Sequence, residues 1–492
     1  KVRQTTATAT KITDAEGNAK GEEDVSRYEL QIFRLNFLLL QCIGLWISDS
    51  ASRCAKILYS CFTVFVLSVL TLNFTTQIAA LFHYRANLRI ITYTLASLTG
   101  TVITSCDYVN FLCRKRTVLN MVEEMQTGFI AKVRPKYRKY LDKTESQAKI
   151  FTLLRCLLAV FAVITAGIMP LILTAKATKV EGGTTNTTIE DIIAEKMIIG
   201  MYTPFDIRRS PQFEAVYAYQ VLAGTMMVIA SQSVDLMLMV LMSLVAARFT
   251  ILGKQLNDMA ENVAMNETNY EKNKLHEDCS TLDGTCEEKG AEGPNEEVFR
   301  QYLVECIKEH QAAIEFAYRL NDVIGIAGLI DMITIPIMLC STGYLMMHGV
   351  NVTNYFKFLT LFLLVMYKLL VYCWYGQDVI NQSEEVQTAL YGTDWYRLSP
   401  AFKRLVPLML MRASKAVKLR NGIFNDLCFA TFSGVRLFLL QDLGTVLKLG
   451  TGTVPYKHKG SSSAAGGNKY WARFAVPKGQ GCQHSALAIG VK

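Results

Sequence analysis

The stretch AVYAYQVLAGTMMVIASQSVDLMLMVLMSLVAA, from Ala215 to Ala247, decides the fold class of this chain. It contains a single charged side chain, Asp235. A helix that crosses about 30 Å of hydrocarbon needs roughly 20 mostly apolar residues, so this stretch is longer than the requirement. The sequence therefore predicts a membrane-spanning helix here.

Six further apolar stretches lie on either side of it, three before and three after. The seven predicted spans are residues 57–82, 90–112, 151–175, 215–247, 323–347, 355–375 and 423–440. The last is marginal in length. Composition agrees with this interpretation, since 51% of the residues are hydrophobic and the charges cluster between the apolar stretches. We expect an all-α, seven-transmembrane helical membrane protein.

Basic residues predict the side of the membrane on which each short loop lies. The segment before the first span and the loops after the second and sixth spans contain 25 Lys and Arg residues, whereas the opposite loops contain 7. The loop from Arg248 to Asn321 exceeds the length for which this rule holds and is not counted. The N-terminus is therefore predicted to be cytoplasmic. The net charge of +9 is mostly this topology signal, so we expect basic loops facing membrane lipids and no nucleic-acid partner.

Three segments have compositions unlike that of the membrane domain, which we place at residues 35–440. Residues 1–34 read as a flexible cytoplasmic tail without a signal peptide. Residues 266–295 form a polar insert in the long loop that we expect to be partly disordered, and from Glu296 an amphipathic helix leads into the fifth span. Residues 441–492 form a C-terminal extension rich in Gly, Ser and Lys.

Catalytic and metal-binding patterns are not found. Ten of the thirteen cysteines lie within or beside the spans, where we expect buried small hydrophobic side chains. Cys279 and Cys286 share the acidic loop without His or Cys partners at zinc spacing. The sequence has no HExxH, GxSxG or P-loop motif, and its six His residues are scattered. We therefore expect no enzyme activity, no metal and no cofactor.

Two blocks of sequence carry a resemblance to a known family. One is LVECIKEHQAAIEFAYRLNDV at Leu303 to Val323, just before the fifth span. The other is YCWYGQDVINQSEEVQTALYGTDWYRLSPAFKRLVPLMLMRASKAVKLRNGIFNDLCFATFSGV at Tyr372 to Val435, with a weaker match at Gly44 to Trp46. Together they resemble insect odorant receptors, over most of the chain from about Leu35 to Val435.

The resemblance implies a ligand-gated, non-selective cation channel in the plasma membrane of olfactory sensory neurons. It implies a heterotetramer with the family's odorant co-receptor, in which this chain is the ligand-tuning subunit. Helices at the cytoplasmic ends of the later spans would form the subunit anchor, with His310, Trp395 and Tyr396 as candidates. The seventh span would line the pore, whose narrow part the family pattern places around Thr445 to Leu449, with the pore candidates Gln441 and Asp442 about one turn before it.

This chain departs from the family pattern in two places. After Val435 the family normally continues with a Ser- and Tyr-containing helix end and stops within a few residues, whereas here RLFLLQDLGTVLKLG leads into a tail of roughly forty more. The acidic middle of the long loop is also extended. A mis-spliced or misassembled 3′ end is the favoured explanation of the first difference, with a real variant as the alternative. The second is either specific to a lineage or an annotation artefact.

Ligand chemistry follows from the extracellular halves of the second to sixth spans. Small volatile odorants gain affinity by burying apolar surface, with one or two polar groups fixing their orientation. The candidate ligand-binding residues are Tyr93, Ser97, Ile168, Met169, Tyr217, Met226, Met227, Thr342, Tyr344, Phe356 and Thr360. Ordinary helix packing is the alternative role for each of them.

Ionisable residues within spans are costly and are candidates for function. Asp235, Asp331, Lys357 and Lys368 meet this criterion. We expect Lys357, near a span end, to extend toward the membrane surface. Asp331 and Lys368 both lie toward the cytoplasmic half, so a salt bridge between them is predicted, with a water-filled ion path as the alternative.

The predicted topology separates three glycosylation sequons. Those at Asn186 and Asn351 fall outside the cell and are expected to carry glycan, whereas that at Asn266 falls inside.

Two other receptor classes are alternatives to the odorant-receptor interpretation. A G-protein-coupled receptor has its N-terminus outside, and no DRY-like or NPxxY-like motif is found. A gustatory-receptor-type channel shares the topology but has a TYhhhhhQF pattern that is absent here.

Overall fold

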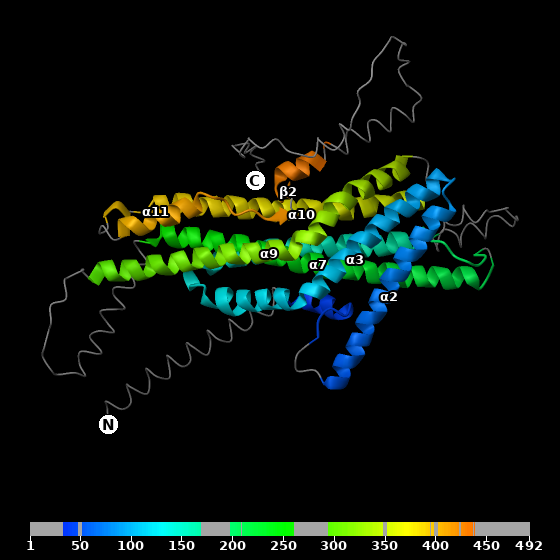
Figure 1. The fold of residues 1–492 in the computed structure, drawn as a ribbon, viewed down its shortest axis with the longest axis horizontal. Coiled ribbons are helices and arrows are strands. Elements are labelled where there is room, and N and C mark those ends of the chain that lie inside the picture. The colour runs from blue at the N-terminus through cyan, green and yellow to red at the C-terminus, as the bar shows by residue number, and fades with distance from the viewer. Residues whose placement is uncertain are drawn as a thin grey trace, which may run out of the picture. The chain divides into compact units, whose positions relative to one another are not determined.

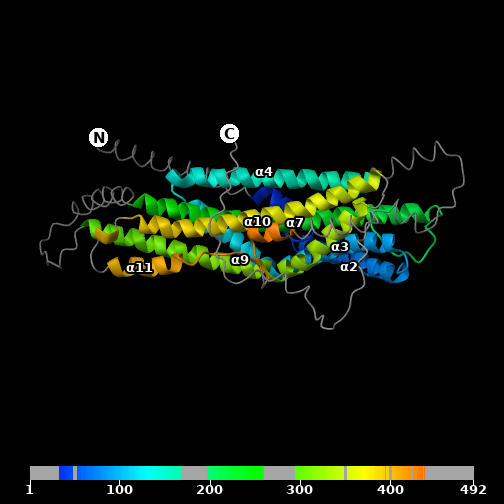
Figure 2. The same cartoon turned by 90° about the horizontal axis from the view of Figure 1, so that it is seen from above.

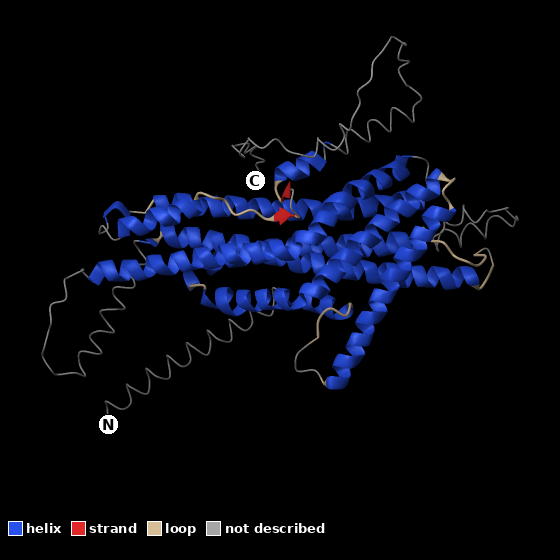
Figure 3. Ribbon diagram, viewed as in Figure 1, coloured by secondary structure: helices blue, strands red, loops and turns tan. Residues whose placement is uncertain are grey.

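The computed structural model describes residues 33–47, 52–168, 197–207, 209–259, 294–347, 352–393, 395–397, 402–422, 425–435 and 437. These residues are almost entirely helical (Figures 1 and 3). The long helices are α2 (Arg53–His83), α3 (Leu88–Glu123), α4 (Arg138–Val163), α7 (Gln212–Asn257), α9 (Pro294–Met347) and α10 (Val352–Tyr391). Each of the first six predicted spans lies on one of them, although 169–175 of the third span lie outside the described residues.

Short irregular helices join or extend the long ones. The π-helix η1 (Glu124–Phe129) and the 3₁₀ helices η2 (Ile130–Lys132) and η3 (Pro135–Tyr137) connect α3 to α4. A second π-helix, η4 (Ile164–Ile168), continues α4. Beyond α10 come the 3₁₀ helix η5 (Trp395–Arg397) and the amphipathic helix α11 (Phe402–Ala413).

Helix α7 forms the centre of the bundle. Its apolar part is 94% buried, because α10, α4, α9 and α3 all pack against it. Figure 2 shows α4 along one edge of the bundle, where it packs against α10 as well as α7. A helix that is hydrophobic on every face must be covered on every face, and this explains why the stretch Ala215 to Ala247 lacks an amphipathic pattern.

The outer helices α2 and α4 have the opposite character. In the most apolar stretch of each of these two helices, only 22% of the residues are buried. Large side chains such as Ile57, Leu58, Leu153 and Leu157 are exposed. In the described part of the chain five helical segments are long and apolar enough to cross a membrane. They are α2, the stretch Pro135–Ile168 that contains α4, and the helices α7, α9 and α10. Exposed apolar surface on this scale suits contact with lipid, so the protein is a multi-pass membrane protein.

Three helices extend beyond the predicted spans toward the cytoplasmic side. Helix α7 continues to Asn257, α9 begins at Pro294, and α10 continues to Tyr391. The expected amphipathic helix leading into the fifth span is therefore present as the first part of α9. Polar contacts tie these extensions together, since Thr250 Oγ1 donates to Gln382 Oε1 at 2.8 Å and Tyr302 donates to the Gln255 carbonyl at 3.1 Å.

In the predicted seventh span, the described residues before Phe429 are not helical. Strands β1 (Arg420–Asn421) and β2 (Asn425–Asp426) form an antiparallel hairpin, and the described helix begins at Phe429, whereas the span was predicted to begin at Ile423. Gly422 at the turn has a φ of 70°, a left-handed conformation that glycine adopts easily. The Asn421–Gly422 dipeptide is a typical hairpin signal, which explains why the prediction was wrong here.

Candidate functional site

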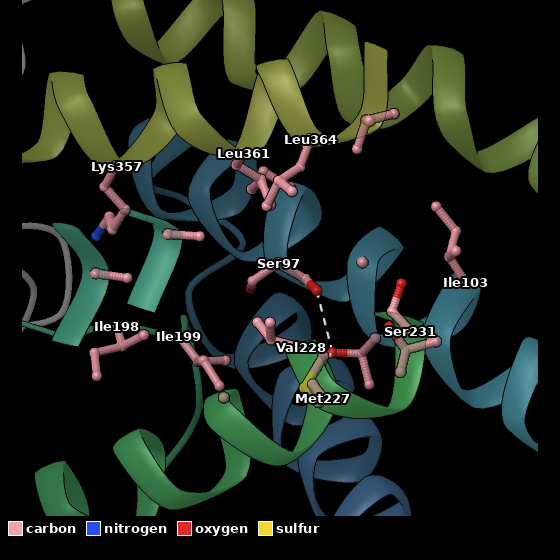
Figure 4. A pocket seen from close by; sticks show the side chains of 18 of the residues that line it. Ser97, Ile103, Ile198, Ile199, Met227, Val228, Ser231, Lys357, Leu361 and Leu364 are labelled. Atoms are coloured by element: carbon pink, nitrogen blue, oxygen red, sulfur yellow. Dashed lines mark hydrogen bonds between the residues drawn. The ribbon is translucent and has the colours of Figure 1, made fainter. Parts of the chain in front are cut away.

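A pocket of about 230 Å³ lies where α3, α7, α9 and α10 meet the end of α4 and the segment 197–207. Its walls are mainly apolar: Figure 4 shows Leu361 and Leu364 on one side and Ile198 and Ile199 on the other. Pockets that hold drug-sized ligands measure about 300–1,000 Å³, so this one suits a smaller organic molecule. It lies in the part of the bundle that the predicted topology places toward the outside.

The wall formed by Ile198 and Ile199 is fixed by Gln220 of α7. The Gln220 side-chain oxygen accepts from the Ile198 backbone N–H at 2.8 Å, and its amide nitrogen donates to the Ile199 carbonyl at 3.0 Å. Gln220 is fully buried. A buried amide whose hydrogen bonds are satisfied stabilises a single arrangement, so this non-helical segment forms a defined wall.

Three of the predicted ligand-binding residues line the pocket, namely Tyr93, Ser97 and Met227. They come from α3 and α7, two helices that are neighbours in the bundle. The Thr101 hydroxyl donates to Met227 Sδ at 3.9 Å, so the sulfur is held near the centre of the pocket (Figure 4). These residues give the pocket one hydroxyl-bearing wall and one polarizable wall.

Seven further candidates lie elsewhere among the described residues, and Met169 lies outside them. Tyr217 donates to the Gly167 carbonyl at 2.8 Å and so lies behind the lining. Thr342 and Thr360 donate to carbonyls of their own helices, at 2.8 and 2.7 Å. The lining also does not include Ile168, Met226, Tyr344 and Phe356.

Lys357 differs from its prediction. The side chain is 7% exposed and lines the pocket instead of extending to the membrane surface. Its Nζ donates to the Tyr93 hydroxyl at 3.1 Å and to the Met197 carbonyl at 3.2 Å, and the Tyr93 hydroxyl donates to the same carbonyl at 2.6 Å. The ammonium also lies 4.7 Å from the Tyr93 ring centre and 5.1 Å from that of Phe358. These neutral acceptors hold it inside the bundle.

A buried ionic cluster lies at the other end of the pocket. Lys368 Nζ is 2.8 Å from Asp107, 3.2 Å from Asp235 and 2.8 Å from Asp331. The predicted ion pair between Asp331 and Lys368 is therefore present, but as one of three. Arg155 pairs with Asp235 as well. All five side chains are buried, so each charge depends on its partners.

Sequence reasoning missed Asp107 and Arg155. Both lie within predicted spans, toward the end of the second and near the start of the third. The criterion that selected the other ionisable residues applies to them equally and identifies both. The pairing itself could not be found, because it depends on which helices are neighbours.

The candidate anchor residues lie on the cytoplasmic extensions. His310 is buried in the part of α9 that precedes the predicted span, with its ring 6.2 Å from that of Phe249. Burial, together with Arg412, lowers the pKa of His310 to about 4. Trp395 is partly buried against the core, whereas Tyr396 is 54% exposed. Of the three, Tyr396 offers the most free surface.

Several predicted residues lie outside the described residues. They are Met169, the sequon residues Asn186 and Asn351, and the pore candidates Gln441, Asp442, Thr445 and Leu449. Their roles stay predictions.

The chain is similar to known proteins at the level of a family and of individual sequences. A family model described as 7tm Odorant receptor matches residues 87–436. Odorant receptor 85b of Drosophila melanogaster is 26% identical over 133 residues, covering 27% of this chain and 34% of that protein. Odorant receptor Or2 of Anopheles gambiae is 20% identical over 120 residues, covering 24% and 32%. The matched stretches thus span about a third of these curated relatives.

Solved structures share the fold over a longer range. The insect olfactory receptor OR5 from Machilis hrabei, in complex with eugenol, aligns with a TM-score of 0.70 and 13% identity. The alignment covers 87% of this chain and all of that one. Another structure of the same receptor aligns with a TM-score of 0.69. At this identity the likeness concerns the arrangement of the helices.

Proposed function

Because the chain belongs to the 7tm odorant receptor family, we propose that it binds small volatile molecules in the pocket between α3, α7, α9 and α10 and thereby gates a cation channel. The pocket is the observation that carries this proposal. It is small, largely apolar and lined by residues of α2, α3, α4, α7, α9 and α10, so an occupant can contact all six of these helices. A receptor of the same fold has been solved with eugenol, itself a small organic compound.

The affinity expected from such a pocket is modest. Burying about 200 Å² of apolar ligand surface contributes roughly 5 kcal/mol, from which the loss of ligand freedom must be subtracted. Useful sensitivity then depends on a few polar contacts. The lining supplies several neutral polar side chains that can orient a ligand, among them Ser97, Thr104, Ser231 and Gln232.

Assembly with the odorant co-receptor forms the second part of the proposal. The end of α10 and the following helices η5 and α11 expose four large side chains, each more than half accessible in the single chain. They are Tyr391, Tyr396, Leu408 and Met411. Apolar side chains on helices outside the hydrocarbon need protein partners to leave water. We propose that this surface contacts neighbouring subunits in the plasma membrane of olfactory sensory neurons. The pore is assigned to the seventh span by resemblance alone.

Heterologous expression tests the proposal. With the co-receptor present, we expect cation current within seconds of odorant application, and little or no current when the chain is expressed alone. Co-receptor alone serves as the control for currents that do not depend on this chain. An odorant response that requires G-protein signalling and no co-receptor would contradict the proposal.

A further inference from the structure

Lys357 is the pocket-lining cation without a carboxylate partner among the residues that the structure describes. The other two, Arg155 and Lys368, are paired with aspartates. Lys357 lies eleven positions before Lys368 on α10, which corresponds to about 16 Å along the helix axis. The two ends of the pocket therefore differ in charge balance.

The surroundings of Lys357 stabilise its charge only in part. A buried ammonium loses its hydration, and hydrogen bonds to a hydroxyl and a carbonyl with two aromatic rings nearby replace part of it. An ammonium has three N–H donors, and the described residues accept two of them. One donor is therefore available to a molecule in the pocket.

The space beside Lys357 is suited to an apolar chain. Ile198, Ile199, Leu361 and Leu364 form the neighbouring walls (Figure 4). A ligand with a negatively charged head at Lys357 and an apolar body along these walls would neutralise the free ammonium and bury its chain. At the far end, the three aspartates around Lys368 disfavour a second anionic group.

From this geometry we infer that the pocket selects small monocarboxylates, with Lys357 as the residue that binds the carboxylate and determines specificity. The inference rests on the proposed function, because it takes this pocket as the ligand site. A charge-assisted hydrogen bond is roughly twice as strong as a neutral one, so an acid should bind more tightly than its methyl ester, whose carbonyl is a neutral acceptor.

The test compares butanoic, hexanoic and octanoic acids with their methyl esters. Thermal stabilisation of the purified chain in detergent gives binding without reference to current, and currents with the co-receptor are recorded in parallel. We expect at least one acid to act at a concentration about tenfold or more below that of its ester. Lys357→Met should abolish this preference, and Lys357→Arg should keep it.

Leu361→Ala is the matched control. It removes apolar surface from the same wall and should weaken acid and ester equally. Equal potency of acids and esters on the wild-type chain, or an acid preference that survives Lys357→Met, would overturn the inference. Acid binding without current would reject the channel proposal alone, and currents evoked by esters with no acid preference would reject the monocarboxylate inference alone.

Discussion

The buried charges are the side chains on which the bundle depends most at the level of single residues. Lys368 contacts aspartates from α3, α7 and α9, so one side chain joins four helices including its own α10. Tyr372 also donates to Asp235, at 3.1 Å. Such a cluster fixes which helices are neighbours, since any other arrangement leaves a charge unpaired in an apolar interior.

We predict that Lys368→Met strongly destabilises the protein. Removing one partner of a buried ion pair costs about 3–5 kcal/mol, because the other partners stay buried and uncompensated. The measurement is the thermal unfolding temperature of the purified chain in detergent. Lys357→Met is the matched control on the same helix: it removes a cation that neutralises no carboxylate, and its unfolding temperature should stay close to that of the wild type. Equal effects of the two substitutions would contradict this account of the cluster.

The sequence predicted which buried charged residues matter, but it did not predict what surrounds each of them. The rule on charges within spans correctly paired Asp331 with Lys368. It gave the wrong environment for Lys357, because nearness to a span end does not reveal whether the side chain faces lipid or the bundle. The rotation of each helix about its own axis decides whether a side chain points toward lipid or toward the bundle. The apolar composition of a span does not determine this rotation.

At the level of elements, the hairpin β1–β2 determines how the chain enters the seventh predicted span. Leu427, the residue after β2, packs closely against α10 at Gly376, where a Cβ atom would overlap the Leu427 backbone carbonyl. The Leu427 N–H also donates to the Leu419 carbonyl at 2.8 Å, which holds this segment in place. Close backbone approach of this kind is available only to glycine.

Gly376→Ala should therefore displace the segment that leads into the seventh span and destabilise the protein by about 1–3 kcal/mol, as overpacking typically does. Gly325→Ala on α9 is the control, because a Cβ atom there meets nothing within 4 Å. That control should leave the unfolding temperature unchanged or raise it slightly, since alanine favours helix more than glycine does. Tolerance of Ala at position 376 would show that the hairpin does not pack as described.

Helices were the most predictable elements, because long apolar stretches determine them directly. The continuous helix α9 was expected from the amphipathic pattern after Glu296. The predicted seventh span included Asn425 and Asp426, which instead form strand β2, since the local turn signal at Asn421 and Gly422 outweighs the apolar residues that follow.

For the whole molecule, two observations lead to the same fold. The family model matches residues 87–436, which confirms the resemblance found in two sequence blocks. The structural likeness to an olfactory receptor persists at 13% identity. The apolar pattern and the helix lengths therefore specify the arrangement of the helices. The pocket depends on particular side chains, which relatives of the same fold need not share. Which ligand fits could not be derived from sequence, because the lining comes from seven separate segments of the chain.

The central claim is that a small ligand in this pocket opens the channel. Gly224 lines the pocket, and a Cβ atom added there meets nothing within 4 Å. Gly224→Leu should therefore fill the pocket without disturbing the helix. Gly325→Leu adds the same side chain at a helical glycine that does not line the pocket and has equally free space.

The decisive measurement is the concentration dependence of the odorant-evoked cation current for the wild type and both variants, each expressed with the co-receptor. We predict that Gly224→Leu raises the half-maximal concentration about tenfold or more, or abolishes the response, while Gly325→Leu responds as the wild type does. Surface labelling should show equal amounts of all three proteins. A wild-type concentration dependence in Gly224→Leu would contradict the account.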